Sequence, residues 1–409
     1  MWKDTINTTI VQLSRLLSQK NFSEYLESSG MDRYVKKLFT PQLLVLLIYA
    51  HLRKHEGLRS ISDSLKAGDM KQAIGLNEIS ASQISRRLNT LPTEALQVLA
   101  RDLITQYQFK KGTTILRKTI GRLYLIDSST ISLCLSTYNW AVFRKEKGGV
   151  KLHLRLEFHE DGVLPDCAVI TEAKPSDKTQ MDALVLRDPD AINVFDRGYI
   201  DYKKFDAYCE NGVRFVSRLK KNAAVEVVKR CKVKASSQIT NDCVVCLGNK
   251  GTTKMKHPLR LIQTIDTEGN PFVIVTNVFD LTAEEISVIY RNRWQIELFF
   301  KWIKQNLMMK HFYGMSRQAV TNQIFIALIT YCLLMLLKLE TGFNGKLTVF
   351  KRLLITCSFE PFDAFVYKLL HKPKRRQKLN LETDLKLIER MVKAGAGCIY
   401  CQYSDDLYV

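Results

Sequence analysis

The spacing of apolar side chains changes about a quarter of the way along the 409-residue chain. In the first part apolar residues recur at helical intervals, as Leu13, Leu16 and Leu17 do, and the segment 43–52 is strongly apolar. Residues three and four apart share one face of a helix, so this spacing predicts amphipathic helices. We therefore expect a helical N-terminal domain over residues 1–112.

Beyond residue 120 the pattern becomes one of short apolar runs, rich in strand formers, that alternate with helical segments. The predicted strands are 122–127, 149–158, 163–172, 192–196 and 213–219, and the predicted helices are 177–186 and 202–212. Gly162 separates the second and third strands and makes them a predicted hairpin. This order indicates an α/β fold with a mixed sheet covered by helices. We expect residues 113–220 to form the first part of this α/β domain.

The rhythm changes again after residue 220. Strand-like runs occupy residues 258–266 and 271–278, without clear helices between them. Short strands in succession indicate β structure of a different kind from the preceding alternation. We expect a β-rich insertion over residues 221–280.

A long helix is predicted after this insertion. Thr282 and Glu285 form a Thr-x-x-Glu capping box, which marks a helix start, and the helical pattern continues to about Asn306. We expect residues 281–340 to complete the α/β domain and residues 341–409 to form a helical C-terminal region.

Within the N-terminal part, residues 75–92 predict two short helices around a turn. Ser82 is placed to cap the second helix, which carries Arg86 and Arg87. Basic residues on such a helix can meet DNA, as in a helix-turn-helix. A plain helical hairpin explains the pattern about as well, so both interpretations stay open.

The charge balance indicates a class of partner. The chain has 61 Lys and Arg residues against 41 Asp and Glu, a formal net charge of +20. Such an excess attracts polyanions over long distances, and nucleic acid is the first candidate. The start of the chain lacks the features of a secretory signal, so we expect a cytoplasmic, nucleoid-associated protein. The apolar run Ile324–Leu337 is too short to span a bilayer comfortably, which predicts a buried helix and no membrane partner.

The chain also has ten cysteines, which we expect to be reduced in a protein without an export signal. Two Cys-x-x-Cys pairs, Cys243/Cys246 and Cys398/Cys401, could bind a structural zinc only if they met in space. Because the first pair lies in an apolar, strand-like stretch, buried cysteines are the favoured interpretation.

Candidate chemistry comes first from the long helix. Each residue advances about 100° around a helix. Four polar residues then fall within about 60° of one another, beside an apolar face: Tyr290, Arg293, Glu297 and Lys304. The helix thus presents one carboxylate among two cations and a phenol. An ordinary Arg293–Glu297 ion pair is the simpler explanation of the helix alone.

Two aspartates favour a catalytic interpretation. Asp127 and Asp196 each end an apolar, strand-like run where a loop is expected to begin. Strand ends are where α/β sheets bind ligands, and Glu297 adds a third carboxylate. Three carboxylates without a nearby His or Cys cluster suit Mg²⁺, or Mn²⁺, better than zinc. Two such ions about 4 Å apart can serve both ends of an in-line phosphodiester cleavage.

These residues resemble a known family. The spacing of the four helix residues resembles the YREK signature of bacterial insertion-sequence transposases of the insertion sequence four type. The segments LIDSSTI and FDRGY, around Asp127 and Asp196, resemble the two aspartate motifs of that family. The resemblance spans about residues 120–340 and implies a ribonuclease H-like core with a DDE active site.

The resemblance also implies roles. Asp127, Asp196 and Glu297 are expected to hold the metal ions and catalyse, while the signature's Tyr, Arg and Lys position terminal DNA phosphates. The expected partners are double-stranded DNA, as terminal inverted repeats and target, and further copies of the chain in a homodimer or larger assembly. Members cut at the ends of their element and join the 3′ ends to target DNA. The alternatives are a ribonuclease H-like nuclease without strand transfer and a non-catalytic basic DNA-binding protein.

Three further side chains have two interpretations each. Lys151 and His153 alternate with apolar residues and share one sheet face, which we expect to be solvated, with DNA contact as the alternative. Trp294 is expected to pack against the insertion, with stacking on an unpaired base as the alternative.

Overall fold

The computed structural model describes residues 7–112, 121–144, 147–233, 238–249, 251, 253–265 and 269–371. The chain divides into two compact units, Met1–Phe365 and Val366–Val409. In the second unit the described residues are the end of helix α15 (Phe362–Leu370) and His371, whose ring stacks on Tyr367. The sheet and the helices that surround it belong to the first unit.

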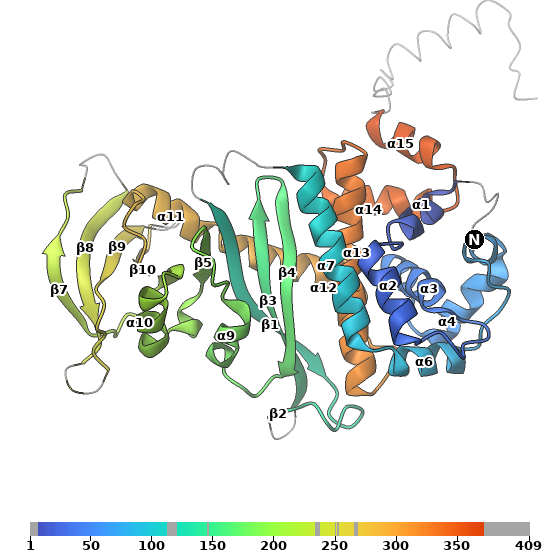
Figure 1. The fold of residues 1–409 in the computed structure, drawn as a ribbon, viewed down its shortest axis with the longest axis horizontal. Coiled ribbons are helices and arrows are strands. Elements are labelled where there is room, and N and C mark those ends of the chain that lie inside the picture. Colours follow the sequence, from blue (N-terminus) through green and yellow to red (C-terminus); the bar gives the residue numbers. More distant parts are fainter. Residues whose placement is uncertain are drawn as a thin grey trace, which may run out of the picture. The chain divides into compact units, whose positions relative to one another are not determined.

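Helices account for most of the described residues before 113 (Figure 1). They are α1 (Thr9–Arg15), α2 (Lys20–Ser29), α3 (Thr40–Arg53), α4 (Leu58–Asp63), α5 (Asp69–Ile74), α6 (Ala81–Thr90) and α7 (Thr93–Lys111). Every side chain from Leu43 to Leu52 in α3 is buried, as expected of a helix that is apolar on all sides. The predicted helical character of this part is confirmed.

The segment 75–92 differs from its prediction. It contains one helix, α6, because residues 76–80 have no helical structure. The cap is Ser80 and not Ser82: the Ser80 hydroxyl accepts from the Gln83 N–H at 3.3 Å, and the Gln83 side chain accepts from the Ser80 N–H at 3.1 Å. This reciprocal capping box starts the helix earlier than expected. The prediction of two helices in this segment is wrong.

A ten-stranded sheet forms the centre of the first unit. Its first six strands are β1 (Arg122–Leu133), β2 (Val142–Arg144), β3 (Lys147–His159), β4 (Gly162–Glu172), β5 (Ala191–Phe195) and β6 (Arg214–Arg218). Strand β3 pairs antiparallel with β1, β2 and β4, whereas β5 is parallel to both β1 and β6. The expected mixed sheet flanked by helices is confirmed, as is the β3–β4 hairpin.

The remaining strands extend the same sheet. They are β7 (Val225–Arg230), β8 (Ile239–Leu247), β9 (Leu259–Ile265) and β10 (Pro271–Thr276). All four are antiparallel to their neighbours, and β10 joins them to β6. Cys243 and Cys246 lie on β8 as free thiols, and Cys243 is buried. Cys398 and Cys401 lie outside the described residues.

The long helix predicted from Thr282 is two helices, α11 (Ala283–Arg291) and α12 (Trp294–Asn306). The predicted capping box is present, because the Thr282 hydroxyl accepts from the Glu285 N–H at 3.2 Å and the Glu285 carboxylate accepts from the Thr282 N–H at 2.7 Å. The helix axis is interrupted at Asn292 and Arg293. The prediction of one uninterrupted helix is therefore wrong.

The interruption is a tight turn and not an open loop. The N–H of Arg293 bonds to the carbonyl of Tyr290 at 3.0 Å, and the N–H of Ile296 bonds to the carbonyl of Arg293 at 3.1 Å. Hydrogen bonds three residues apart wind the chain more tightly than an α-helix does. The angles of a single helical wheel therefore do not apply across this junction.

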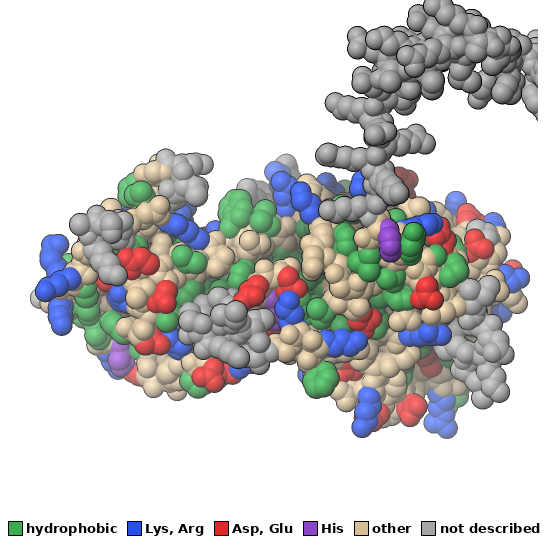
Figure 2. All heavy atoms as spheres, turned by 90° about the horizontal axis from the view of Figure 1, so that it is seen from above, with side chains coloured by type: hydrophobic (Ala, Val, Ile, Leu, Met, Phe, Trp, Pro, Cys, Tyr) green, Lys and Arg blue, Asp and Glu red, His purple; other side chains and the backbone are tan. Residues whose placement is uncertain are grey.

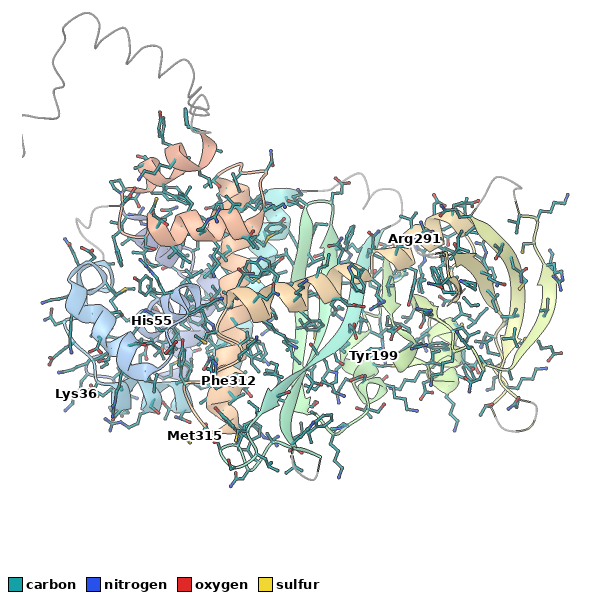
Figure 3. All side chains as sticks on the ribbon, turned by 180° about the vertical axis from the view of Figure 1, so that it is seen from behind. Lys36, His55, Tyr199, Arg291, Phe312 and Met315 are labelled. Carbon is teal, nitrogen blue, oxygen red and sulfur yellow. The ribbon has the colours of Figure 1, made fainter. Side chains whose placement is uncertain are left out.

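Helices cover both faces of the sheet (Figures 1 and 3). The short helix α9 (Met181–Leu184) packs on β3 and β4 from one side, and α12 packs on β1 and β4 from the other. Helix α13 (Arg317–Glu340) packs on α7 and on α14 (Leu347–Thr356). Helix α13 is long and apolar enough to cross a membrane, but 94% of its apolar window is buried in the fold, as predicted for a core helix.

The polar face of β3 is covered too. His153 is completely buried, and the Lys151 side chain is only 12% exposed. Two short 3-10 helices, η2 (Asp177–Gln180) and η3 (Arg197–Tyr199), lie on this side of the sheet and contact each other. The prediction of a solvated face was wrong because these turns cover positions that strand alternation alone assigns to solvent.

Candidate active site

Asp127 and Asp196 lie next to each other where the β1–β5 pairing ends. The last parallel pair is Ile126 with Phe195, so the next position along the two strands brings Asp127 beside Asp196. Strand β1 itself continues to Leu133, paired with β3. The prediction that Asp127 ends its strand is therefore wrong. Asp127 instead lies one position beyond the last pair between β1 and β5.

The environment of Asp127 opposes its negative charge. Burial raises the pKa of Asp127 to about 6, and the neighbouring carboxylates of Asp196 and Glu297 act in the same direction. The Ser128 N–H, which donates to Asp127 Oδ1 at 2.7 Å, and Arg293 act in the opposite direction. Buried carboxylates that lie close together are a common feature of sites that bind cations or transfer protons.

Arg293 connects two of the three acids. Its Nη1 lies 3.4 Å from Asp127 Oδ2, and its Nη2 donates to Glu297 Oε1 at 2.6 Å. The turn between α11 and α12 places this guanidinium against the sheet, where its side chain is only 14% exposed. The structure thus brings Asp127, Asp196 and Glu297 together from β1, β5 and α12.

Tyr290 and Lys304 flank this centre. The Tyr290 ring is buried, packs on Phe272 of β10 and lies 5.9 Å from the guanidinium of Arg293. Burial raises the pKa of Tyr290 to about 12, so the phenol is neutral. Lys304 Nζ donates to Ser129 Oγ at 2.7 Å and to the backbone carbonyl of the next residue at 2.9 Å, which fastens α12 to β1.

These residues fit a hard divalent cation in kind and in charge. Carboxylate oxygens are the ligands that Mg²⁺ and Mn²⁺ prefer. Two carboxylates contact the Arg293 guanidinium here, and Asp196 lies beside one of them, Asp127. In the part of the chain that the structure describes, no three His, Cys, Asp or Glu side chains form a preformed metal cage. Arg293 instead bridges Asp127 and Glu297 directly.

The basic residues of α6 differ from each other. Arg87 Nη2 lies 2.5 Å from Asp32 Oδ1 and donates to Thr40 Oγ1 at 2.8 Å, so its charge is used to hold α6 against α3. Arg86 is exposed.

On the face drawn in Figure 2, Lys and Arg side chains are spread among Asp and Glu rather than gathered in one patch.

Trp294, the first residue of α12, is 56% exposed. A tryptophan packed against neighbouring strands would be largely buried, so the expected packing against the insertion is wrong.

Asp177 is a residue of this region that the sequence analysis missed. Its Oδ1 accepts from Ser128 Oγ at 2.8 Å and lies 2.9 Å from Lys151 Nζ. An aspartate at the start of a predicted helix is usually a local cap. Nothing in the sequence distinguished Asp177 from such a cap.

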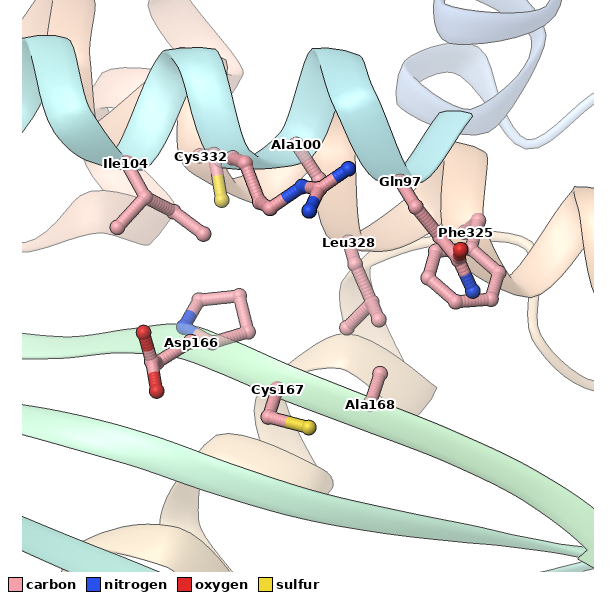
Figure 4. Close-up of a pocket in the computed structure, with 11 residues that line it drawn as sticks. Gln97, Ala100, Ile104, Asp166, Cys167, Ala168, Phe325, Leu328 and Cys332 are labelled. Carbon is pink, nitrogen blue, oxygen red and sulfur yellow. The ribbon is translucent and has the colours of Figure 1, made fainter. Parts of the chain in front are cut away.

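A pocket of about 260 Å³ lies elsewhere in the fold, between α7, β4 and α13 (Figure 4). Its lining includes Ile104, Leu328 and Cys332, with Asp166 at one side. None of the predicted catalytic or DNA-binding residues line it.

Comparisons with known proteins point to one protein family. A family profile described as the transposase DDE domain matches residues 118–333, which is more than half of the chain and includes all three acids. A second profile, described as a domain of unknown function, matches residues 5–75.

Individual relatives are transposases. The protein named transposase y4zB from Sinorhizobium fredii is 31% identical over 68% of this chain and 76% of its own length. The protein named as the transposase for insertion sequence element IS5377 of Geobacillus stearothermophilus is 26% identical over 80% of this chain and 84% of its own. A solved structure, the piggyBac transposase synaptic complex with hairpin DNA, aligns with 94% of this chain and 86% of its own at 10% identity and a TM-score of 0.44. On the match of its DDE domain and of these relatives, the chain belongs to the DDE transposases of bacterial insertion sequences.

Proposed function

We propose that this transposase cuts DNA at the terminal inverted repeats of its own insertion sequence and joins the 3′ ends to target DNA, with Asp127, Asp196 and Glu297 as its catalytic acids. The observation that carries the proposal is the convergence of these carboxylates from three separate parts of the chain: Arg293 contacts Asp127 and Glu297, and Asp196 lies beside Asp127. Convergence of acids distant in sequence is what metal-dependent phosphoryl transfer requires.

The three acids are the ligands for Mg²⁺, with Mn²⁺ as an alternative. When bound, the ions activate the attacking oxygen and stabilise the departing one. The chain's part is to hold Asp127 and Asp196 where the β1–β5 pairing ends and Glu297 on α12. Because the pKa of Asp127 is about 6, this carboxylate is available to a cation at neutral pH.

The side chains around Glu297 position the DNA phosphates, as the YREK signature implies. A phosphate presents two oxygens to the forked guanidinium of Arg293, which exchanges its contacts with Asp127 and Glu297 for contacts with these phosphate oxygens. Tyr290 packs beside the guanidinium and orients it. Lys304, held against β1, places an ammonium close to the acids.

The rest of the chain binds the DNA and helps to bring the second end of the insertion sequence to the first. Residues 1–112 act as a DNA-binding domain in which Arg86 contacts phosphate and Arg87 holds α6 in place. Residues 113–220 and 281–340 form the catalytic domain, 221–280 its β-rich insertion and 341–409 the C-terminal region. The protein acts on nucleoid DNA in the cytoplasm as a homodimer or larger assembly, since two element ends are cut and joined.

The test uses the pure protein, a duplex that carries the inverted repeats flanking its gene, a target plasmid and Mg²⁺. We expect cleavage at the repeat ends and covalent products that join the 3′ ends to the plasmid. Cleavage without joined products would identify the ribonuclease H-like nuclease instead. DNA binding without any metal-dependent cleavage would identify the non-catalytic DNA-binding protein.

A further inference from the structure

Five polar side chains meet behind the catalytic acids, on the opposite face of β1. We call them the Asp177 cluster: Asp177, Lys151, His153, Ser128 and Tyr199. Successive residues of a strand point to opposite faces of the sheet. Asp127 and Ser129 face α12, where they meet Arg293 and Lys304, so Ser128 between them faces the other side.

Asp177 is the centre of this cluster. Its Oδ1 accepts from Ser128 Oγ at 2.8 Å, lies 2.9 Å from Lys151 Nζ and lies 3.8 Å from His153 Nδ1. His153 is held on its other side by Thr171, with 3.0 Å between Nε2 and Oγ1. Burial lowers the pKa of His153 to about 4, so the ring is neutral and Lys151 supplies the balancing positive charge.

The cluster touches both strand ends that carry catalytic aspartates. Ser128 directly follows Asp127 on β1. Tyr199 ends η3, the turn that follows Asp196, and it is 1% exposed. Its buried hydroxyl lies beside Ser128 without a hydrogen bond of normal geometry among the described residues. Asp177 begins η2, which packs on η3.

The backbone pairing of β1 with β5 does not by itself fix the distance between Asp127 and Asp196. Backbone pairing of β1 with β5 ends at Ile126 and Phe195, one position before Asp127 and Asp196. Two carboxylates placed side by side also repel each other when both carry negative charge. Some other contact must therefore fix their separation, and the η2–η3 contact anchored by Asp177 lies directly behind them.

We propose that Asp177 is a positioning residue that fixes the separation of Asp127 and Asp196 for divalent cations, with Lys151 neutralising its charge. The inference rests on the proposed function, because it assigns Asp177 to the same metal site. Groups that orient metal ligands without touching the metal typically change metal affinity by about 10- to 100-fold when removed. A merely structural ion pair would change stability and leave metal affinity unchanged.

The experiment compares the full chain with its Asp177→Ala variant in two ways. Mn²⁺ is titrated into the protein alone, and the free ion is followed by its EPR signal. Cleavage of the repeat-end duplex is measured against Mg²⁺ concentration. For Asp177→Ala we expect the Mn²⁺ dissociation constant and the half-maximal Mg²⁺ concentration to rise about tenfold or more, with DNA affinity unchanged.

A matched control is Asp166 of β4, which pairs with a cation of the same strand, β3, as Asp177 does. Asp166 pairs with Arg155 of β3, and its side chain is buried to a similar degree. We expect Asp166→Ala to lower stability without a change in either metal constant. If Asp177→Ala does not fold, Asp177→Asn and Lys151→Met replace it, and both are expected to weaken Mn²⁺ binding.

The outcomes separate the two proposals. Unchanged Mn²⁺ binding by folded Asp177 or Lys151 variants overturns the positioning role, as does an equal loss in Asp166→Ala. A wild-type chain that binds Mn²⁺ but never cleaves the repeat ends overturns the proposed function, while the Mn²⁺ titration still decides the role of Asp177. A wild-type chain that does neither overturns both.

Discussion

The Arg293 guanidinium is the centre of the site at the scale of single residues. It reaches Asp127 and Glu297 with different nitrogens, and the Tyr290 ring lies beside it. Only a planar, forked cation can make both contacts at once, because a lysine ammonium is a point charge on a flexible stem.

Arg293→Lys is therefore expected to lose function although it keeps the charge. We expect the cleavage rate to fall on the order of a hundredfold, comparable to the removal of one donor that stabilises a reacting phosphate or oxyanion. Single-turnover cleavage of the repeat-end duplex measures this effect. Arg291→Lys, on the exposed side of α11, is the matched control and should cleave normally; similar losses in both variants would contradict the special role of Arg293.

The buried charge of Asp127 also has a pH-dependent cost. Its folded-state pKa of about 6 lies above the ordinary aspartate value of 3.8, so the ionised carboxylate opposes folding. The resulting loss of folding stability is small below pH 3.8 and grows as pH rises from 3.8 to about 6. Above about pH 6 the loss has reached its full size. A shift of this size corresponds to at most about 3 kcal/mol.

Asp127→Asn should therefore stabilise the chain in the absence of divalent ions. We expect its free energy of unfolding to exceed that of the wild type clearly at pH 8 and only slightly at pH 4. Urea unfolding at both pH values measures the difference. A variant that is less stable than the wild type at pH 8 would contradict the assigned environment of Asp127.

The proximity of the three acids and of the residues around Glu297 could be predicted because short motifs carry these residues. Asp177 and Lys151 could not, since their contact depends on the register of β3 against β1 and on a turn that covers the sheet. Arg87 and Trp294 show the same limit. The ion pair of Arg87 and the exposure of Trp294 are set by tertiary structure, which no local sequence pattern records.

At the scale of elements, the junction between α11 and α12 decides how the acids meet. The segment has no Pro or Gly that would announce an interruption, so helical periodicity predicted one helix. The tight turn at Asn292 and Arg293 directs the guanidinium onto the sheet.

The strands β7 to β10 were likewise foreseen as strands, but their continuity with the central sheet depends on the pairing of β10 with β6.

The capping box of α11 allows a test of stability apart from catalysis. Thr282→Ala removes the hydroxyl that accepts from the Glu285 N–H. We expect a loss of about 1 kcal/mol in the free energy of unfolding, because a helix N–H is left without its partner. Denaturant unfolding measures the loss, and cleavage by the folded variant should stay normal. A large loss of cleavage without a loss of stability would mean that α11 has a direct role in catalysis.

At the scale of the whole molecule, we expect the net charge of +20 to contribute most of the affinity for DNA. On the face in Figure 2 the positive side chains are dispersed among acidic ones. Long-range attraction of this kind is strongly screened by salt.

We therefore expect the affinity for the repeat-end duplex to fall by about 10³-fold or more between 50 and 200 mM salt, as for proteins with six or more phosphate contacts. Arg86→Ala should reduce the slope of log affinity against log salt by about 1. Arg86→Lys keeps the charge and should keep the slope. Fluorescence anisotropy at several salt concentrations measures these slopes, and equal slopes for Arg86→Ala and the wild type would remove Arg86 from the interface.

The most direct test of the central claim is the cleavage of a repeat-end duplex in Mg²⁺ by the wild type and by Asp127→Asn, Asp196→Asn and Glu297→Gln. The site predicts cleavage by the wild type alone, with DNA affinity largely unchanged in all three variants, because each substitution removes a metal ligand and preserves its shape. Normal strand cleavage by any one of the three variants would contradict the assignment of these carboxylates as the catalytic acids.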